Sequence, residues 1–292
     1  MTRSVSSIDA VREAVGSARS RRLSIGLVPT MGALHDGHVD LIRAARRETG
    51  FTVVSIFVNP AQFGPNEDFT RYPRPIEKDL EICRAEAVDI VFAPEVQTIY
   101  PADFRTFVEV QQLQDVLEGA SRPGHFRGVT TVVLKLLNIV QPDLAYFGQK
   151  DAQQARIIQQ MVQDLDLQVA LAIRSIVREP DGLALSSRNR YLSPEERQHA
   201  TVLYQVLQEA REQIEAGEKD AAALKQRLEA RIRNTPGAVV DYVAVVSPDS
   251  FQAVHDLTGD VLVALAVRFG RTRLLDNLFL PAYDRPGGRS RS

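Results

Sequence analysis

Short, almost wholly apolar runs alternate with amphipathic stretches along the first 180 residues. Residues 51–58 (FTVVSIFV) are β-branched and aromatic with almost no polar alternation, which is typical of a strand buried on both faces. Residues 38–48 instead place Leu41, Ile42 and Ala45 on one face, which predicts a helix. The pattern further predicts strands at 23–29, 90–92, 144–147 and 169–177, and helices at 75–87, 129–140 and 152–165.

This repetition of strand and helix predicts an α/β fold, a Rossmann-like doubly wound parallel sheet with right-handed crossovers and helices on both faces. Ligands of such sheets bind outside the carboxyl ends of the strands, at the point where the strand order reverses. The loops that follow the strands are therefore the places to search for chemistry.

The pattern changes in the last third of the chain. Ser193, followed by Pro194 and Glu196, is typical of a helix start, and the helix is predicted to run to about Ala216, before Gly217. A second helix is predicted at 221–233 and three short strands at 239–246, 261–267 and 274–278. We therefore predict a first domain at 1–177, a smaller α+β domain at 178–285 and a disordered tail at 286–292.

Composition excludes several classes of protein. The 292 residues carry a formal net charge of −2, which argues against a generally basic nucleic-acid binder. The purest apolar run, 261–267, is far shorter than the ~20 residues that span a bilayer, and the first 16 residues lack the apolar stretch of a signal peptide. The single cysteine, Cys83, cannot form an internal disulfide. We expect a cytoplasmic protein with neither a membrane nor a nucleic-acid partner.

Candidate chemistry follows the first predicted strand, in GLVPTMGALHDGHVDLIRAAR. Gly37 removes a side chain where a helix begins, and the unpaired N–H groups of a helix start favour phosphate. His35 and His38 flank this glycine and could each donate a hydrogen bond to the same phosphate. A zinc site is disfavoured, because no third ligand lies nearby in the sequence. The chain also has neither G-x-G-x-x-G after this strand nor G-x-x-x-x-G-K-[ST], so neither usual phosphate loop is present.

The segment PTMGALHDGH resembles the HIGH-type signature of the nucleotidyltransferase superfamily, and in its extended form that of the pantoate–β-alanine ligase (pantothenate synthetase) family. Further blocks agree in order over about residues 23–280: FVNPAQF at 57–63, EDF at 67–69, YPR at 72–74, RPGHFRGV at 122–129, FGQKD at 147–151 with Gln154, and LSSRN at 185–189. The resemblance implies a two-step reaction. Pantoate attacks the α-phosphate of ATP to give pantoyl adenylate, which β-alanine then converts to pantothenate and AMP. It also implies Mg²⁺ with the ATP and a homodimer. Because water would hydrolyse the mixed anhydride, we expect the second domain to act as a lid that excludes it.

The resemblance further implies which residues act. The catalytic residues would be His35, His38, Lys150 and Arg188. The pantoate-binding residues would be Pro29, Met31, Gln62, Phe63 and Gln154, and Asp79 would bind magnesium. The ATP-binding residues would be Met31, Gly32, His35, Gly37, His38, Gly148, Lys150, Asp151, Val177, Leu185, Ser186, Ser187 and Arg188.

Several alternatives stay open at this stage. The loop at 185–189 has no lysine where the superfamily usually has Lys-Met-Ser-Lys-Ser, so Lys150 and Arg188 would carry the charge between them. Lys150 beside Asp151 could be a surface pair, and the loop could be a polar turn. Asp79 could be a solvated helix charge. Glu118 could orient Arg122 or His125 or have a structural role. Residues 104–110 could be an edge strand that pairs in a dimer.

Two other functions compete with this one. The first is another adenylyltransferase that stops at the nucleotide adduct, with a phosphate-bearing acceptor. The second is a catalytically silent nucleotide-binding module, although that module would be expected to lack one of His35, His38 or Lys150.

Overall fold

The computed structural model describes residues 2–65, 67 and 69–282. The chain forms two compact units: unit 1 comprises Met1–Gln149 and Gln153–Ser175, and unit 2 comprises Lys150–Ala152 and Ile176–Ser292. The main division lies after Ser175, whereas the sequence places it after residue 177. The return of Lys150–Ala152 to unit 2 was not predicted. The predicted tail at 286–292 lies outside the described residues.

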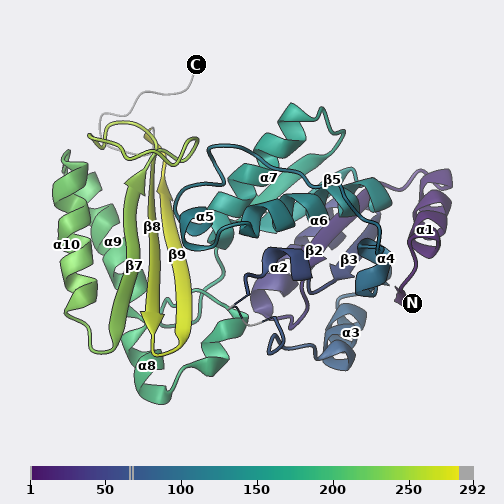
Figure 1. Cartoon of the computed structure of the whole chain (residues 1–292), viewed down its shortest axis with the longest axis horizontal. Coiled ribbons are helices and arrows are strands. Elements are labelled where there is room, and N and C mark those ends of the chain that lie inside the picture. The colour runs from purple at the N-terminus through teal and green to yellow at the C-terminus, as the bar shows by residue number, and fades with distance from the viewer. Residues whose placement is uncertain (1, 66, 68, 283–292) are drawn as a thin grey trace. The chain divides into compact units, whose positions relative to one another are not determined.

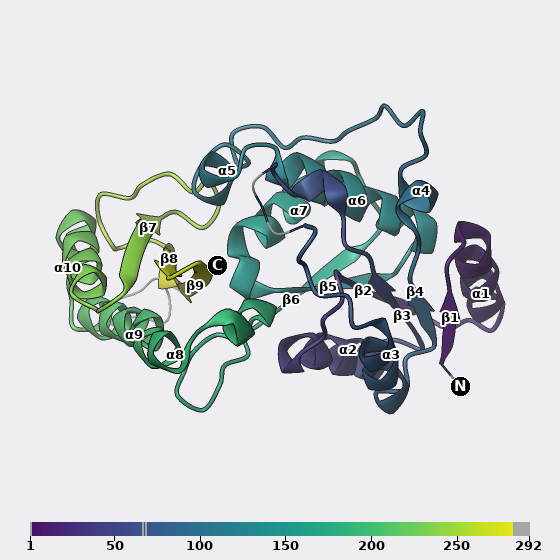
Figure 2. The ribbon, with the colours of Figure 1, turned by 60° about the horizontal axis from the view of Figure 1, so that its bottom comes forward.

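Unit 1 is built on a six-stranded sheet in the order β1-β4-β3-β2-β5-β6, whose described pairings are all parallel (Figures 1 and 2). The strands are β1 (Arg3–Val5), β2 (Ile25–Thr30), β3 (Phe51–Ile56), β4 (Ile90–Phe92), β5 (Leu144–Gly148) and β6 (Ala170–Arg174). The longer helices are α1 (Ile8–Ser20), α2 (Asp36–Glu48), α3 (Ile76–Ala85), α6 (His125–Val140) and α7 (Ala152–Asp164). The short ones are η1 (Pro60–Gln62), α4 (Val96–Ile99), α5 (Glu118–Ser121) and η2 (Gln149–Asp151).

Helices cover both faces of this sheet. Figure 2 shows α2 and α3 on one face, and α6 and α7 on the other. On the first face, Ile42 of α2 and Cys83 of α3 pack in one buried cluster with Val28, Val54 and Val91 of the central strands. Burial raises the pKa of the Cys83 thiol to about 12, so this cysteine is a packing residue. The predicted doubly wound α/β fold is confirmed.

The strand order reverses at β2. From β2 the chain proceeds outward to β3 and β4, then returns to the other side of β2 to form β5 and β6. The hydrogen-bonded ladder between β2 and β5 pairs Gly26 with Leu144 and Leu27 with Ala145 and extends no further, although β2 continues to Thr30 and β5 to Gly148. The carboxyl ends of these two strands therefore separate at the switch point, where ligands of such sheets bind.

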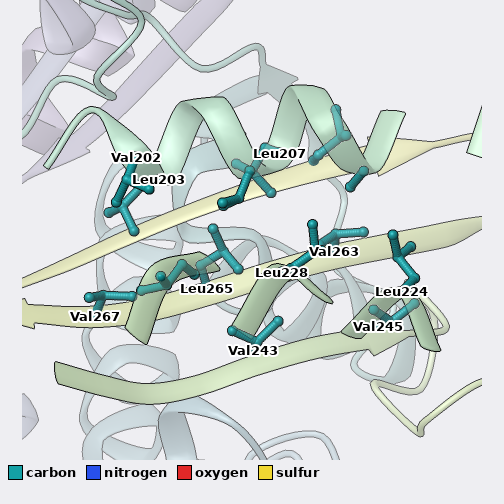
Figure 3. Close-up of a cluster of buried hydrophobic side chains, with 14 of the residues drawn as sticks. Val202, Leu203, Leu207, Leu224, Leu228, Val243, Val245, Val263, Leu265 and Val267 are labelled. Carbon is teal, nitrogen blue, oxygen red and sulfur yellow. The ribbon is translucent and has the colours of Figure 1, made fainter. Parts of the chain in front are cut away.

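Unit 2 is a three-stranded antiparallel sheet with helices on one face. Its strands are β7 (Ala238–Val246), β8 (Val261–Phe269) and β9 (Thr272–Leu280), and its helices are η3 (Ser187–Tyr191), α8 (Pro194–His199), α9 (Val202–Glu215) and α10 (Ala221–Arg233). Figure 3 shows Leu203 and Leu207 of α9 and Leu228 of α10 among Val243, Val263 and Leu265 of the strands. The alternate residues of the strands thus supply the core of the predicted α+β unit.

Some element predictions were wrong. The predicted single helix from 194 to 216 is broken between α8 and α9, because the amide and the hydroxyl of Thr201 both donate to the Gln198 carbonyl and tighten that turn. Residues 104–110 form no strand: the Val108 amide donates to Thr131 Oγ1, and the Val108 carbonyl accepts from Thr130 Oγ1. Side chains of α6 therefore take the bonds that a strand partner would have made. β1 and α1 were not predicted.

No described helix combines the length and the apolar character that crossing a lipid bilayer demands.

Candidate active site

The loop between β2 and α2 is held by the protein's own side chains. Thr30 Oγ1 donates to the Ser55 carbonyl at 2.7 Å and accepts from the Gly32 amide at 3.1 Å. Gly32 and Ala33 both have positive φ (79° and 52°), so the chain turns sharply here. A side chain at Gly32 would be strained by this φ and would place its Cβ 2.8 Å from Asp79 Oδ2.

Asp79 of α3 closes the other side of this loop. Its Oδ2 accepts from the Ala33 amide and its Oδ1 from the Leu34 amide, both at 2.8 Å, and the residue is 1% exposed. Asp79 is therefore not the solvated helix charge that the sequence left open. It fixes the segment directly before His35, and the magnesium role predicted for it stays a prediction.

His35 and His38 are held at the start of α2, with ring centroids 4.1 Å apart. His35 is the N-cap, and its Nδ1 accepts from the Gly37 amide at 3.1 Å. His38 Nδ1 accepts from the His35 amide at 3.3 Å. Because each Nδ1 accepts a backbone N–H, the proton of each neutral ring is on Nε2. The backbone of the helix start thus makes both rings Nε2–H donors.

Gln62 lies at the end of η1 in a buried polar network. Its Nε2 donates to Met31 Sδ at 3.0 Å, and its Oε1 accepts from Asn59 Nδ2 at 3.1 Å. Asn59 Nδ2 also donates to the Gly128 carbonyl, and Asn59 Oδ1 accepts from the Tyr100 hydroxyl at 2.9 Å. Two residues predicted to bind pantoate, Met31 and Gln62, are therefore in contact, and Asn59, to which the sequence assigned no role, orients the second.

Gly128 allows α6 to approach η1 closely. A Cβ at this position would lie 2.2 Å from the Ala61 carbonyl oxygen and 2.6 Å from the Gln62 amide nitrogen. Since backbone atoms occupy that space, a side chain at 128 would displace η1, and Gln62 with it.

An ion pair between Arg122 and Glu67 supports Gln62 through His125. The Arg122 guanidinium binds both oxygens of Glu67, at 2.7 and 2.6 Å, and donates to His125 Nε2 at 3.0 Å. His125 Nδ1 donates to the Gln62 carbonyl at 2.9 Å, so this ring has the opposite tautomer to His35 and His38. Burial, aided by the Arg122 charge, lowers the pKa of His125 to about 4, and the ring is neutral at pH 7. Burial raises the pKa of Glu67, but Arg122 outweighs that and keeps it below its usual value.

The other predicted pantoate residues are only partly placed by contacts. The Phe63 ring packs against Phe69 and Tyr72, with centroids 5.4 and 5.9 Å away. Pro29 and Gln154 are half-buried, at β2 and α7. Glu118 is buried, and its amide donates to Gln153 Oε1, so its described contact holds α5 against α7.

Lys150 and Asp151 lie in η2, directly after Gly148 ends β5, yet both belong to unit 2. The Lys150 ammonium is 3.9 Å from Asp151 Oδ1, and these side chains are 22% and 48% exposed. The Lys150 carbonyl accepts from Asn277 Nδ2 of β9 at 2.9 Å. The ion pair with Asp151 is long and partly exposed, so it holds the Lys150 side chain only weakly. The described contact that holds the Lys150 backbone is the one with Asn277.

Residues 177–185 of unit 2 form a hairpin-like loop that leads into η3. The Leu185 amide donates to the Val177 carbonyl at 3.0 Å, and Ser186 Oγ accepts from the Arg188 amide at 3.2 Å as the N-cap of η3. Asn189 Nδ2 donates to both the Ala184 carbonyl and Glu179 Oε1. Leu185, Ser186, Ser187 and Arg188 are thus ordered by hydrogen bonds, and η3 packs beside β9.

The predicted site residues therefore form two groups. Unit 1 brings together His35 with His38 and Met31 with Gln62. Unit 2 holds Lys150 and η3 along the same strand, β9. The sequence assigned no role to Asn59, Tyr100, Arg178, Asp276 or Asn277, because a lone polar residue carries no sign of the long-range contact that gives it one.

Among the described residues, no group of three or more His, Cys, Asp and Glu side chains is arranged to hold a metal ion. Both oxygens of Asp79 already accept backbone N–H groups.

Comparison with known proteins fits this geometry. The family model for pantoate–β-alanine ligase matches residues 3–279. The chain belongs to the pantoate–β-alanine ligase family. The pantothenate synthetase of Moorella thermoacetica is 54% identical over 277 residues, covering 95% of this chain and 98% of that protein. That of Acetivibrio thermocellus is 56% identical over 256 residues, covering 88% and 91%.

Solved structures of this family have the same fold. A crystal structure of pantothenate synthetase from Thermus thermophilus has a TM-score of 0.90 and 46% sequence identity, covering 94% of this chain and 98% of that one. Pantoate–β-alanine ligase from Francisella tularensis, complexed with beta-gamma ATP and β-alanine, has a TM-score of 0.77 and 34% identity, covering 96% and 98%. The family resemblance noted in the sequence is confirmed over nearly the whole chain.

Proposed function

We propose that this chain is an ATP-dependent, AMP-forming acid–amine ligase that condenses pantoate with β-alanine. In the first step the pantoate carboxylate attacks the α-phosphate of ATP, which gives pantoyl adenylate and pyrophosphate. In the second step the β-alanine amine attacks the acyl carbon, and pantothenate and AMP are released. Both nucleophiles belong to substrates, so the protein contributes positioning and charge stabilisation rather than a nucleophile of its own.

The observation that carries this proposal is that His35 and His38 have the same tautomer, with the proton on Nε2. Two neutral rings with their protons on Nε2 lie at the start of α2, beside the strand-order switch point. Hydrogen-bond donors at a helix start favour a phosphate group, and donors oriented in advance stabilise charge that builds up in a transition state. We assign ATP phosphate binding to this pair and to Met31, Gly32 and Gly37 of the same segment.

Gln62 suits the pantoate side of the reaction. Its amide is neutral, so it can hold a hydroxyl or carboxylate without neutralising the charge that must attack. Its two contacts, with Asn59 and Met31, fix the amide orientation before any substrate arrives. We assign pantoate binding to Pro29, Met31, Gln62, Phe63 and Gln154.

Unit 2 supplies positive charge in this proposal. The Lys150 ammonium would contact the phosphates, and Arg188 would contribute a second cation from η3. Gly148, Asp151, Val177, Leu185, Ser186 and Ser187 would line the nucleotide. Residues 178–285 would act as a lid that excludes water from the mixed anhydride, which water would otherwise hydrolyse. Solution scattering that shows no compaction on addition of ATP and pantoate would exclude this lid role.

We propose that magnesium binds together with ATP. ATP reacts as a magnesium complex, and Mg²⁺ usually keeps several waters and binds substrate phosphates. Since Asp79 already binds two backbone amides, the ion would be held chiefly by ATP itself. We further propose a cytoplasmic homodimer with no nucleic-acid partner.

The test is ATP–pyrophosphate exchange measured with and without pantoate, followed by mass detection of pantothenate after β-alanine is added. Exchange that depends strictly on pantoate, and pantothenate that appears only with β-alanine, are the expected results. Exchange that depends on a phosphate-bearing acceptor instead of pantoate would favour an adenylyltransferase. Nucleotide binding without exchange would favour a silent module.

A further inference from the structure

Lys150 is separated from the strand that precedes it. Gly148, two residues before Lys150, is the last residue of β5 in unit 1, whereas Lys150–Ala152 pack with unit 2. The strand that precedes Lys150 in the sequence therefore does not hold it. The structure instead raises the question of which residue of unit 2 holds Lys150.

Asn277 of β9 makes that contact. Its Nδ2 donates to the Lys150 carbonyl at 2.9 Å across 127 residues of sequence, and Asn277 is 4% exposed. A buried amide donor that lost this acceptor would be left without one of its hydrogen bonds, which disfavours movement of the Lys150 backbone. The contact therefore fixes the point from which the lysine side chain extends.

Asn277 is itself held by its neighbour on the strand. Asp276 Oδ1 accepts a hydrogen bond from the backbone N–H of Asn277 at 2.8 Å. Asp276 lies between Leu274 and Leu278, which belong to the core beneath the helices, so the Asp276 side chain points to the helix-facing side of the sheet. Asn277, one residue on, points to the opposite face, toward Lys150.

A buried ion pair anchors this arrangement. The Arg178 guanidinium donates to the two Asp276 oxygens at 2.6 and 2.9 Å and to the Gly182 carbonyl at 3.0 Å. The same guanidinium lies over the Tyr204 ring of α9, 4.8 Å from its centroid. Because Arg178 pairs with the carboxylate of Asp276, that negative charge is already neutralised on the far face of the sheet. The ion pair described for the Lys150 ammonium is instead the long one with Asp151, at 3.9 Å.

We propose that Asn277 is a positioning residue for the known reaction: its side-chain amide holds the Lys150 backbone on β9 and so directs the Lys150 ammonium to the ATP phosphates. Asn277 touches no reacting atom in this proposal and acts only through Lys150. The inference rests on the proposed function of Lys150 in adenylate formation.

The first test compares N277A and N277D with the unmodified enzyme in pantoate-dependent ATP–pyrophosphate exchange. Asparagine and aspartate have almost the same volume, but aspartate cannot donate to the Lys150 carbonyl. We expect both variants to lower kcat of exchange by about 10- to 100-fold, because a displacement near 1 Å can cost that much. If N277A does not fold, N277D provides the same test.

Two further measurements, of pantoate KM and of the second reaction step, distinguish a positioning role from a general structural defect. Pantoate KM should change less than about twofold, because the proposed pantoate residues lie in unit 1 apart from this contact. Single-turnover conversion of pantoyl adenylate with β-alanine should also stay within about threefold of the unmodified enzyme. The matched control is F279A, on the same face of β9 two residues further on and 41% exposed, which should leave exchange unchanged. An equal loss in N277D and F279A, or an equal loss in both steps, would overturn the proposal.

A double-mutant cycle distinguishes this inference from the function on which it rests. If Asn277 acts through Lys150, N277D should add no further loss of exchange in a K150A background. Losses that multiply would overturn the positioning role. If K150A itself retains exchange, the proposed function of Lys150 is wrong. If K150A abolishes exchange while N277D leaves it intact, only the positioning role is wrong.

Discussion

The two units hold their site residues by contacts of very different range. In unit 1, a backbone amide two or three residues away sets the orientation of each ring, His35 and His38. In unit 2, the backbone of Lys150 is held by a side chain 127 residues further along the chain. The first arrangement needs only a helix start, whereas the second needs the whole antiparallel sheet in register. A local motif can therefore specify the histidines but not the lysine.

Two buried aspartates show the same contrast. Asp79 is 1% exposed and accepts two backbone amides of one loop. Asp276 is 2% exposed and binds the Arg178 guanidinium from another segment. Burial raises the pKa of Asp276, and the hydrogen bonds and charge of Arg178 oppose that rise. Removal of Asp79 would leave two backbone N–H groups without an acceptor, whereas removal of Asp276 would leave the Arg178 charge unpaired. The two substitutions should therefore lower the free energy of unfolding by different amounts.

The largest expected effect is that of Asp276→Ala on stability. It leaves the partly buried Arg178 unpaired, which typically costs about 3–5 kcal/mol for a buried pair. Chemical denaturation followed by circular dichroism measures the loss. The control is Asp241→Ala, whose carboxylate binds Arg268 and Arg273 with 18% exposure and should cost less. An equal loss of unfolding free energy in both variants would show that the Arg178–Asp276 pair contributes no more stability than the more exposed pairs of Asp241.

The next effect concerns the donors of unit 1. Asn at position 38 can accept as Nδ1 does but has no group at the Nε2 position, whereas Gln places an amide near Nε2. We expect His38→Asn to lower kcat of ATP–pyrophosphate exchange by about 10²–10³-fold, since one lost donor to a developing oxyanion has that effect. His38→Gln should retain more activity. Both should melt close to the unmodified protein. Greater activity in the Asn variant would mean that the Nδ1 contact, not the Nε2 donor, matters.

A pH effect of similar size is expected from His125. Its pKa is about 4 in the folded protein and near 6.5 when unfolded, so the unfolded chain binds more protons between those values. The free energy of unfolding should therefore fall as pH drops from 6.5 to 4, by about 3 kcal/mol from this residue. Glu67, whose pKa is lowered, acts in the same direction as pH falls further.

Equilibrium unfolding in urea at several pH values measures this dependence. His125→Asn keeps a donor near the Nδ1 position but cannot take up a proton, so its stability should depend less steeply on pH over that range. Parallel curves for this variant and the unmodified protein would show that His125 is not the group responsible.

The smallest expected effect is that of Asp79→Asn. One acceptor for the loop amides would be lost, at a cost of about 1–3 kcal/mol. If Asp79 acts only on the loop, the defect in exchange should be the same at every magnesium concentration. A defect that high magnesium removes would instead support the predicted metal role. Titration of exchange with MgCl₂, alongside melting curves, separates the two outcomes.

The helices and parallel strands of unit 1 could largely be predicted, because buried strands and one-sided helices leave periodic patterns. The prediction failed where side chains compete for backbone bonds. Thr201 broke the predicted long helix, and Thr130 and Thr131 took bonds that an edge strand at 104–110, one of the open alternatives, would have needed. Such contacts depend on which residue lies nearby in space, and the periodicity of apolar residues does not record that.

The sequence by itself determined the α/β class, the family and the pair of histidines at the start of α2, because each follows from residues adjacent or periodic in the chain. The tertiary structure alone decided that Asn59 donates to the Gly128 carbonyl, that His125 donates to the Gln62 carbonyl and that Lys150 is held from β9. The physical reason is that these hydrogen bonds join segments that only the folded sheets bring within 3 Å of one another.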